Sequence, residues 1–403
     1  MDTALASRLR DYLARSNDRM IGLCRRLVGI ESPSSDPESL RAILRVLGDE
    51  LSSRGLAVRA LPGVESGGQL IGVPRNRTHG APYQLLIGHA DTVWPLGTLA
   101  RMPIQLRSGQ LSGPGIYDMK AGLVQAIFAL EALAECGAHP AVTPLVFINT
   151  DEEVGSPESR RQIVRLARAA DRALILEPSL GEPGRLKTAR KGIGRFTVRV
   201  RGRAAHAGLE PEKGASAILE LSLVIQQLFA LNDPKYGITV NVGTIDGGLR
   251  PNVVAPESKA SVEVRVLTWA QAKRVEQRIR DLQPTTPNTR ILVEGRFGRA
   301  PMERTPANAR LWHAARQAGA RLGLELEEAT AGGASDGNTT SLYAPTLDGL
   351  GPVGGGAHAE DEHVDVDQMA ERAALLALLI MEPALGRPGR RHVRARRLSQ
   401  RVS

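Results

Sequence analysis

Aromatic residues are scarce in this sequence, because phenylalanine, tryptophan and tyrosine together make up 3% of its 403 residues. The core of the folded protein must therefore be built mainly from aliphatic side chains. The sequence also lacks any run of eighteen uninterrupted apolar residues, so we expect neither a membrane-spanning helix nor a membrane partner. Charges are spread through the N-terminal segment and interrupt its apolar residues. We therefore expect no secretory signal and a cytoplasmic location.

Cysteine is nearly absent, and the two that occur, Cys24 and Cys136, lie in apolar patterns of helical spacing. We expect both to be free thiols in or near the core. Basic residues outnumber acidic ones, which gives a formal net charge of +9. Much of this excess lies in residues 386–403, which we expect to form a disordered basic tail. Acids and bases roughly balance elsewhere, so we do not expect a nucleic acid partner, although the tail offers a route to one.

The first half of the chain alternates between two kinds of apolar pattern, and the overall length favours two domains. Helical spacing occurs at 4–29, 38–54, 121–137 and about 157–169, and buried-strand patterns occur at 84–88, 144–150 and 172–178. Alternation of this kind predicts a largely parallel sheet with helices on both of its faces.

The pattern changes after residue 188. Strands with one wet face are indicated at 194–202, 238–245 and 258–266, helices among them at 214–230 and 269–282, and further helices from 306 onward and at 367–381. The predicted fold class is α/β, with a mixed, mostly parallel sheet between helices and an inserted small α+β domain. The expected ranges are 1–188 and 301–385 for the large domain, 189–300 for the inserted domain and 386–403 for the tail.

Three consecutive acids follow one of the predicted buried strands, in the segment NTDEEVGS at residues 149–156. Asp151, Glu152 and Glu153 repel one another there and must also give up water as the strand end is buried. A fold that keeps all three charges together needs a positive partner close by.

Other metal-binding residue types stand in equivalent places. His89 and Asp91 follow a second buried strand in GHADTV, and Glu177 follows a third. Ligands of open α/β sheets gather at the carboxyl ends of the strands. Asp118 and His358 lie in glycine-rich loops that can reach the same crevice. Histidines mixed with carboxylates are the ligand set that Zn²⁺ and related cations choose, so the predicted positive partner is a metal.

Two cations use these residues better than one, because a single catalytic ion needs only three protein ligands and an open position. We expect Asp118 to bridge the two ions. His89 and Glu177 would complete one ion's ligands, and Glu153 and His358 would complete the other's.

Two of the acids outside this ligand set have other expected roles. Glu152 is adjacent to a ligand without being one, so we expect it to act as the general base for a water held by the metals. Asp91 stands two residues after His89 and is suited to orient its imidazole.

These motifs occur in a recognisable order: GHADTV, GPGIYDMKAG, NTDEEVGS, ILEP, GRAAHAG, RPNVVAPESKASVEVR, GGASDGN and GAHAEDEHV. The series resembles the M20 family of metallopeptidases, in particular its glutamate carboxypeptidase (carboxypeptidase G2-like) branch, from about residue 10 to residue 384. The resemblance implies two metal ions, with Zn²⁺ expected and Co²⁺ or Mn²⁺ as alternatives. It also implies that the inserted domain is a lid and forms a homodimer contact.

The resemblance assigns further residues. His206 in AAHAG matches a lid histidine that reaches the active site of the partner subunit and stabilises an oxyanion. Asn252 and Arg265 match residues that hold the substrate's carboxylate, and Arg299 matches another such arginine, for which a surface salt bridge is the alternative. Relatives have a cis peptide after the bridging aspartate, so we expect one between Asp118 and Met119.

The implied activity is hydrolysis of an amide bond next to a free carboxylate, in a small molecule or a short peptide. The leaving group would be a C-terminal amino acid such as glutamate. A deacylase that removes acetyl or succinyl groups from amino acids uses the same motifs and is the alternative. A non-catalytic binding protein and a two-metal phosphoesterase are the rivals outside the family, and the ordered motifs count against both.

Overall fold

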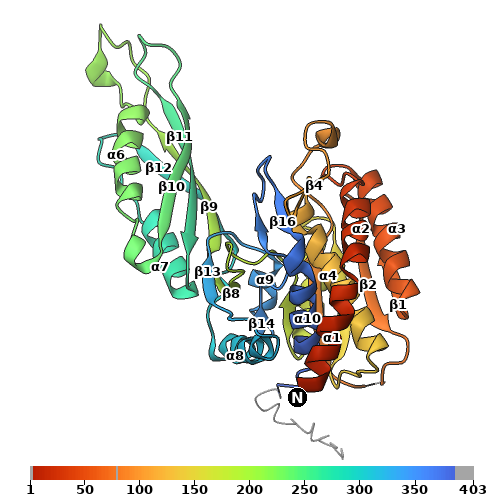
Figure 1. The fold of residues 1–403 in the computed structure, drawn as a ribbon. Helices are drawn as coiled ribbons and strands as arrows, with labels where there is room; N and C mark the ends of the chain where they lie inside the picture. Colours follow the sequence, from red (N-terminus) through yellow and green to blue (C-terminus); the bar gives the residue numbers. More distant parts are fainter. Residues whose placement is uncertain (1–2, 79, 386–403) are drawn as a thin grey trace, which may run out of the picture.

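The structure, a computed structural model, describes residues 3–78 and 80–385. The predicted basic tail at 386–403 lies outside these residues. Figure 1 shows a large domain of helices around a sheet and a slender second domain that projects from it. No helix in the described ranges is long and apolar enough to cross a membrane.

A mixed sheet of six strands forms the centre of the large domain. Its order is β1(Leu56–Leu61), β2(Gln69–Pro74), β6(Thr143–Asn149), β3(Tyr83–His89), β7(Ala173–Ile175), β14(Thr346–Leu347). The strands from β6 to β14 pair in parallel, and β1 and β2 add an antiparallel edge. The predicted mixed, mostly parallel sheet is therefore confirmed, whereas β1 and β2 had not been predicted.

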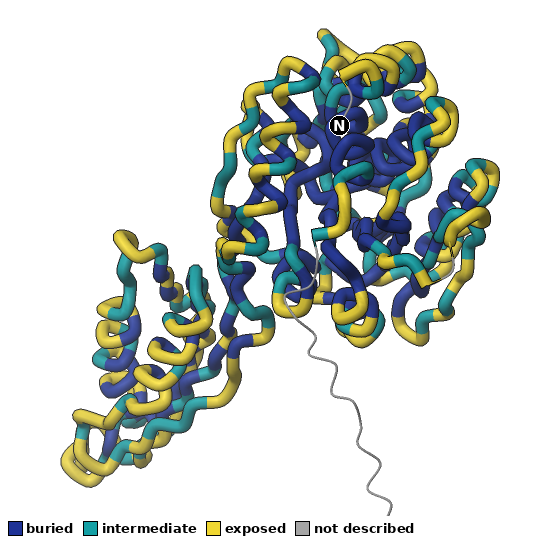
Figure 2. The backbone as a smooth tube through the Cα atoms, turned by 90° about the horizontal axis from the view of Figure 1, so that it is seen from below, coloured by how far each residue is buried: buried dark blue, intermediate teal, exposed yellow. Residues whose placement is uncertain are grey.

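Both faces of this sheet are covered, because successive residues of its strands point to opposite sides. One side packs on a core that includes Leu86, Val146 and helices α1(Thr3–Arg15), α2(Asn17–Val28), α3(Pro37–Ser53), α4(Ala121–Glu135), α8(Pro306–Arg321) and α10(Val366–Met381). The other side, with Leu85 and Phe147, packs on α5(Arg160–Ala169), and α9(Asp336–Thr340) lies near α5. Figure 2 shows the buried residues of this core as a continuous dark region in the large domain.

Two details of the predicted elements were wrong. The helical pattern over 4–29 is two helices that break at Ser16, because apolar periodicity continues through a break of one residue. The strand expected at 172–178 ends at Ile175, since the chain then leaves the sheet and carries Glu177 toward the crevice. Cys24 and Cys136 are both free thiols, as expected.

The inserted domain is a four-stranded antiparallel sheet with helices on one face. Its strands are β10(Thr239–Gly247), β11(Glu257–Val266), β9(Gly192–Arg201), β12(Arg290–Arg299), and its helices are α6(Ala217–Phe229) and α7(Trp269–Arg280). Strand β12 had not been predicted. These elements lie inside the range 189–300, which we keep as the proposed limits of the domain.

Two small sheets complete the large domain. They are β13(Glu328–Ala331) with β8(Leu186–Arg190), and β15(Gly354–Gly355), β16(His363–Asp365), β5(Gln110–Ser112), β4(Gln105–Arg107). The second of them anchors the glycine-rich turn that carries His358. It also stands next to the irregular turn Ile116–Lys120, which carries Asp118.

A close contact between α4 and the chain after β7 fixes the distance between two parts of the crevice. A Cβ atom at Gly122 would lie 2.1 Å from the carbonyl oxygen of Leu176. Gly122 follows the turn that carries Asp118, and Leu176 precedes Glu177. Only glycine allows the helix to approach this backbone so closely.

We predict that Gly122→Ala lowers the midpoint of thermal unfolding, since the new methyl group meets backbone that cannot move aside, at a cost of about 1–3 kcal/mol. The matched control is Gly22→Ala in α2, where a Cβ would meet no atom within 4 Å. This second change should keep or raise stability by up to about 1 kcal/mol through helix propensity. Equal midpoints for the two variants would show that the close approach is not restrictive.

Candidate metal centre

Residues from three strand ends and two glycine-rich loops meet at one edge of the main sheet. The strands are parallel there, so their carboxyl ends open into a common crevice. The residues brought together are His89 at the end of β3, Glu152 and Glu153 after β6, Glu177 after β7, Asp118 before α4 and His358 between β15 and β16.

Asp118 lies between the two histidines. Its Oδ1 atom is 3.2 Å from Nε2 of His89, and its Oδ2 atom is 3.5 Å from Nε2 of His358. Each carboxylate oxygen thus faces a different imidazole. This is the arrangement expected of a carboxylate that bridges two cations. The peptide between Asp118 and Met119 is cis, which confirms that prediction.

Each imidazole also has an outer carboxylate. Nε2 of His89 is 3.6 Å from Oε1 of Glu177, and Nε2 of His358 is 3.3 Å from Oε2 of Glu153. Ligand atoms within 4.8 Å of one another form two overlapping groups, His89–Glu152–Glu177 and His89–Asp118–Glu153. Proximity alone therefore does not separate Glu152 from the expected ligands.

The electrostatics of these residues fit divalent cations. Hydrogen bonds to Asp118 and Glu153 raise the pKa of His358 to about 10. Burial lowers the pKa of His89, but the neighbouring carboxylates outweigh burial and raise it well above its ordinary value. Oε1 of Glu153 is buried and has no hydrogen-bond partner among the described residues. The two imidazoles neutralise the carboxylates only by taking up protons, and one carboxylate oxygen still has no partner in the described residues. The crevice is therefore suited to bind additional positive charge.

The backbone at His358 supports the same reading. Its φ is 63°, a left-handed conformation that glycine adopts without strain and other residues rarely adopt. Glycines precede it at 354, 355 and 356. A histidine kept in such a position indicates that its side chain, and not the turn, is what the fold requires there.

Asp91 organises the crevice from beneath. Nδ1 of His89 lies 3.0 Å from the backbone carbonyl oxygen of Asp91 and 3.4 Å from its Oδ1 atom, and these two contacts direct Nε2 toward Asp118. The two carboxylate oxygens of Asp91 also accept the backbone N–H groups of Glu152 and Glu153, at 3.2 and 3.1 Å. Burial raises the pKa of Asp91, but His89 outweighs burial, so the pKa is lowered overall. One buried carboxylate thus orients both an imidazole and the acid loop.

The three consecutive acids have different partners. Oδ2 of Asp151 accepts the backbone N–H groups of Glu158 and Ser159, at 2.8 and 3.0 Å, just before helix α5. This acid therefore holds the loop and the helix start together. Glu153 faces His358, and Glu152 points to an arginine from the inserted domain.

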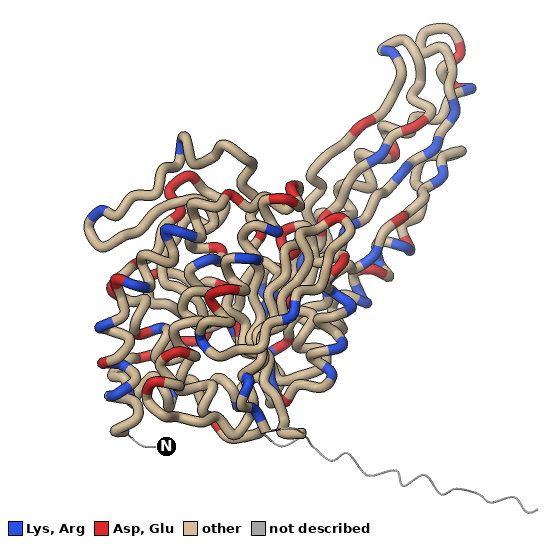
Figure 3. The backbone as a smooth tube through the Cα atoms, turned by 90° about the vertical axis from the view of Figure 1, so that its right-hand side faces the viewer, with Lys and Arg blue, Asp and Glu red and all other residues tan. Residues whose placement is uncertain are grey.

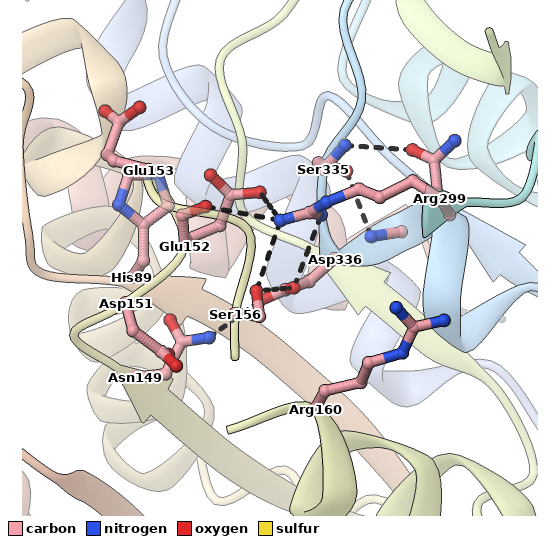
Figure 4. A network of polar contacts seen from close by, with 12 residues as sticks. His89, Asn149, Asp151, Glu152, Glu153, Ser156, Arg160, Arg299, Ser335 and Asp336 are labelled. Carbon is pink, nitrogen blue, oxygen red and sulfur yellow. Dashed lines mark hydrogen bonds and ion pairs between the residues drawn. The ribbon is translucent and has the colours of Figure 1, made fainter. Parts of the chain in front are cut away.

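That arginine is Arg299. Its guanidinium is 3.1 Å from Oε1 of Glu152 and 3.6 Å from Oδ1 of Asp336, in the network drawn in Figure 4. Ser156 and Asn149 donate hydrogen bonds to Asp336, at 2.5 and 2.7 Å. The Arg299 side chain is only 13% exposed. The salt bridge given as the alternative therefore does form, but it lies mostly covered beside the metal centre and not at the surface.

Burial raises the pKa of Glu152 well above its ordinary value, and the charge of Arg299 opposes this effect. Glu152 lies beside the expected metal ligands but is not one of the two residues that the Asp118 oxygens face. Its raised pKa and this position are the properties of a group that carries protons.

Two supporting residues escaped prediction. Glu362 accepts the backbone N–H groups of Gly115, Tyr117 and Asp118 at 2.8–3.0 Å, and so sets the loop that carries the bridging acid. Arg190 is 3.1 Å from Oε2 of Glu177, which turns the other oxygen of that acid toward His89. The surplus of acids in GAHAEDEHV was a signal for Glu362. Nothing in the local sequence marked Arg190.

Residues expected to contact substrate lie at opposite ends of the inserted domain. His206 and Asn252 belong to the loops joining β9 to α6 and β10 to β11, at the end away from the large domain (Figure 1). In the described part of the chain, no hydrogen bond or ion pair joins either of them to the metal centre. Arg265 lies at the other end, where it donates to the carbonyl of Gly332 at 2.8 Å and pairs with Glu263.

A pocket of about 460 Å³ opens beside the metal centre, between the large domain and the base of the inserted sheet. Its polar lining comes from Glu152, Glu153, Arg160, Arg195, Arg296, Arg299 and His358. The pocket is the space in which a small substrate can reach the acids.

Comparison with known proteins agrees with this geometry. The chain is 29% identical to carboxypeptidase G2 of Pseudomonas sp. (strain RS-16) over 96% of its own length and 95% of that protein. It is 30% identical to a succinyl-diaminopimelate desuccinylase of Xanthomonas oryzae pv. oryzae over 75% and 85% of the two chains. The aminopeptidase PepT of Bacillus cereus shares the fold, with a TM-score of 0.74, 23% identity and coverage of 91% and 98%.

The resemblance seen in the motifs is thus confirmed over most of the chain. Residues 85–382 match the family described as peptidase family M20/M25/M40. This chain belongs to that family and is a metal-dependent hydrolase.

Proposed function

We propose that this hydrolase binds two divalent cations and cleaves an amide bond next to a free carboxylate. Zn²⁺ is the expected ion, with Co²⁺ or Mn²⁺ as alternatives. The observation that carries the proposal is the position of Asp118, with one oxygen toward His89 and the other toward His358. Similarity to a protein named carboxypeptidase G2 supports release of a C-terminal amino acid such as glutamate from a short peptide or conjugate.

Five residues would supply the metal ligands, and their short mutual distances support this assignment. Asp118 would bridge, His89 and Glu177 would hold one cation, and Glu153 and His358 would hold the other. The two ions, when bound, would lower the pKa of a water that they share and polarise the scissile carbonyl.

Glu152 would move the proton. Arg299 engages its Oε1 atom, so the second oxygen, Oε2, would take the proton from the attacking water and pass it to the leaving nitrogen. The raised pKa favours holding that proton between the two events. Nη1 of Arg299 has no hydrogen-bond partner among the described residues, so it would offer a substrate carboxylate a donor while Nη2 keeps its contact with Glu152.

His206 would act on the site of a partner subunit. Its Nδ1 atom accepts the backbone N–H groups of Gly208 and Leu209, at 3.1 and 3.2 Å, so the proton of the neutral ring lies on Nε2. An N–H donor fixed in this way suits an oxyanion. Asn252 would reach the same partner site, because its backbone carbonyl accepts the N–H of Ala207, the residue after His206, at 3.0 Å.

Exposed apolar side chains on the inserted domain support a homodimer through that domain. Leu249 is 71% exposed and Ile245 is 67% exposed, and Ile218 and Leu219 on α6 are also exposed. Apolar surface that is grouped in this way often marks a protein contact.

The alternative function is removal of an acyl group from an amino acid. Similarity to a desuccinylase supports it, and the same cations and the same base would serve. Rates of hydrolysis for a panel of N-acyl amino acids, dipeptides and folate-type glutamates would discriminate between the two.

The role of Glu152 predicts a specific defect. Glu152→Gln should lower kcat by about 10²–10⁴-fold, because an amide cannot accept the proton, while both metal ions remain bound. Glu153→Gln should instead lower the metal content, since it removes a ligand. Steady-state kinetics combined with elemental analysis of the two variants separates these effects. A kcat near that of the unmodified protein in Glu152→Gln would refute the proposed base.

The pKa values predict proton release on metal binding. Because the pKa of His89 and His358 is raised above the ordinary value, both imidazoles carry protons at pH 7 without metal. Ligation requires neutral rings, so binding should release up to about two protons, and the apparent affinity should rise with pH. Calorimetric titration with Zn²⁺ in buffers of different ionisation enthalpy measures this number. Zero release would contradict the assignment of the two ligands.

The position of His206 predicts complementation between subunits. His206→Ala and Glu152→Gln should each be nearly inactive alone. Mixed dimers would contain one site with both residues intact, so an equimolar mixture should recover about a quarter of the normal activity after subunit exchange. Mixing Glu152→Gln with Glu153→Gln is the control and should recover no activity. Each change damages the metal centre of its own chain, so both sites of the mixed dimer are defective. No recovery in the first mixture would end the partner-subunit role.

A further inference from the structure

The pocket beside the metal centre has more positive charge than its own acids can neutralise. Its lining contains four arginines and two carboxylates. Glu152 pairs with Arg299 at 3.1 Å, and Glu153 faces His358 at 3.3 Å. The other three arginines therefore have no acid of the pocket to pair with. They are Arg160, Arg195 and Arg296.

Two of these arginines stand side by side on the inserted sheet. Arg195 of β9 and Arg296 of β12 are directly opposite in the antiparallel register. Like charges in such pairs destabilise a sheet. Arg195 is 80% exposed and has one long contact, 3.5 Å, with Glu263. The Arg296 side chain has no hydrogen bond or ion pair with any residue in the described ranges.

The third arginine comes from the large domain. Arg160 on α5 donates a hydrogen bond to the carbonyl of Gly298 at 2.9 Å, which leaves its charge unneutralised. Figure 4 shows it apart from the network that holds Arg299. It lines the same pocket as the arginine pair and contacts strand β12, which carries Arg296.

Basic residues are common on this domain, as Figure 3 shows, so a pair of them is not by itself a binding site. Arg201 and Arg290 form a second pair between the same two strands. That pair lies six residues along β9 from Arg195, or about 20 Å, and it does not line the pocket. What distinguishes Arg195 and Arg296 is the cavity in front of them and the nearby metal centre.

The register also gives the distance from the reacting groups. Arg299, which touches Glu152, is opposite Ile193, two residues before Arg195 on β9. The arginine pair is therefore about 7 Å farther along the sheet. An extended chain advances about 3.5 Å over three bonds, so a substrate with its amide at Glu152 covers about half of this distance with a group three bonds long, and the arginine side chains must reach across the rest.

We propose that Arg195 and Arg296, flanked by Arg160, form a subsite for a second carboxylate of the substrate. The guanidinium fork matches a carboxylate, and a pocket of about 460 Å³ holds an amino-acid-sized group. This inference rests on the proposed function and narrows it to substrates with two carboxylates. The second carboxylate is either an acidic side chain of the released amino acid or the end of a diacid acyl group.

Steady-state kinetics of the full-length, metal-loaded protein and of its Arg195→Gln/Arg296→Gln variant test the subsite. Two substrate pairs are compared, N-acyl-glutamate with N-acyl-glutamine and an N-succinyl with an N-butanoyl amino acid. The unmodified protein should prefer the dicarboxylate of one pair by about tenfold or more in kcat/KM. The variant should lose this preference mainly through KM. The pair that shows the preference tells which product carries the second carboxylate.

Ligand-induced shifts of the unfolding midpoint test the subsite without hydrolysis. Glutarate should raise the unfolding midpoint of the metal-loaded protein more than butyrate at equal concentration, and the double variant should respond equally to both. Equal responses in the unmodified protein would overturn the subsite.

Arg201→Gln/Arg290→Gln is the matched control, because it removes the same charge from the same strands outside the pocket. This control variant should keep the preference for dicarboxylates. If it lost the preference, the preference would come from the general positive charge of the sheet and not from the subsite. If no substrate is hydrolysed in a metal-dependent way, the proposed function fails while the glutarate comparison still decides on the subsite. Metal-dependent hydrolysis without preference in either pair, with equal responses to the two acids, removes the subsite alone.

Discussion

The crevice depends on one half-buried carboxylate that faces two imidazoles at once. Asp118 can face both His89 and His358 only if its loop is fixed, and the loop is fixed because Glu362 accepts three of its backbone N–H groups. Burial would raise the pKa of Asp118, but the two imidazoles outweigh burial and hold the pKa well below its usual range. The acid therefore stays charged, and a charged acid without water needs cations around it.

The neighbouring acids show how a fold tolerates several like charges in a small volume. Each of the three after β6 has a different environment: backbone N–H groups for Asp151, Arg299 for Glu152 and His358 for Glu153. Asp91 accepts the N–H groups of the last two and so fixes the direction in which each side chain leaves the loop. Because each acid has its own partner, one of them would be able to carry protons while its neighbour binds metal, as proposed.

The sequence was sufficient to predict which strand-end residues lie together, because parallel strands bring their carboxyl ends to one edge of the sheet, so position in the chain translates into position in space. The same logic failed where contacts come from outside that edge. Strand β12 is interrupted by Gly295 and Gly298, and its alternation is too weak to recognise, so the arrival of Arg299 beside Glu152 could not be foreseen. Arg190 reaches Glu177 from another small sheet, and no local pattern encodes that contact.

The inserted sheet has two ends with different relations to the chemistry. Its base is tied to the large domain by polar contacts from both sides, Arg160 to the carbonyl of Gly298 and Arg265 to the carbonyl of Gly332. Groups at this end, including Arg299, therefore keep a fixed relation to their own subunit's acids. The far end has no such tie in the described residues, and His206 there presents its Nε2 proton to solvent. A rigid sheet of this length cannot bring both ends to one centre, so the donor at the tip would serve a second subunit in the proposed homodimer.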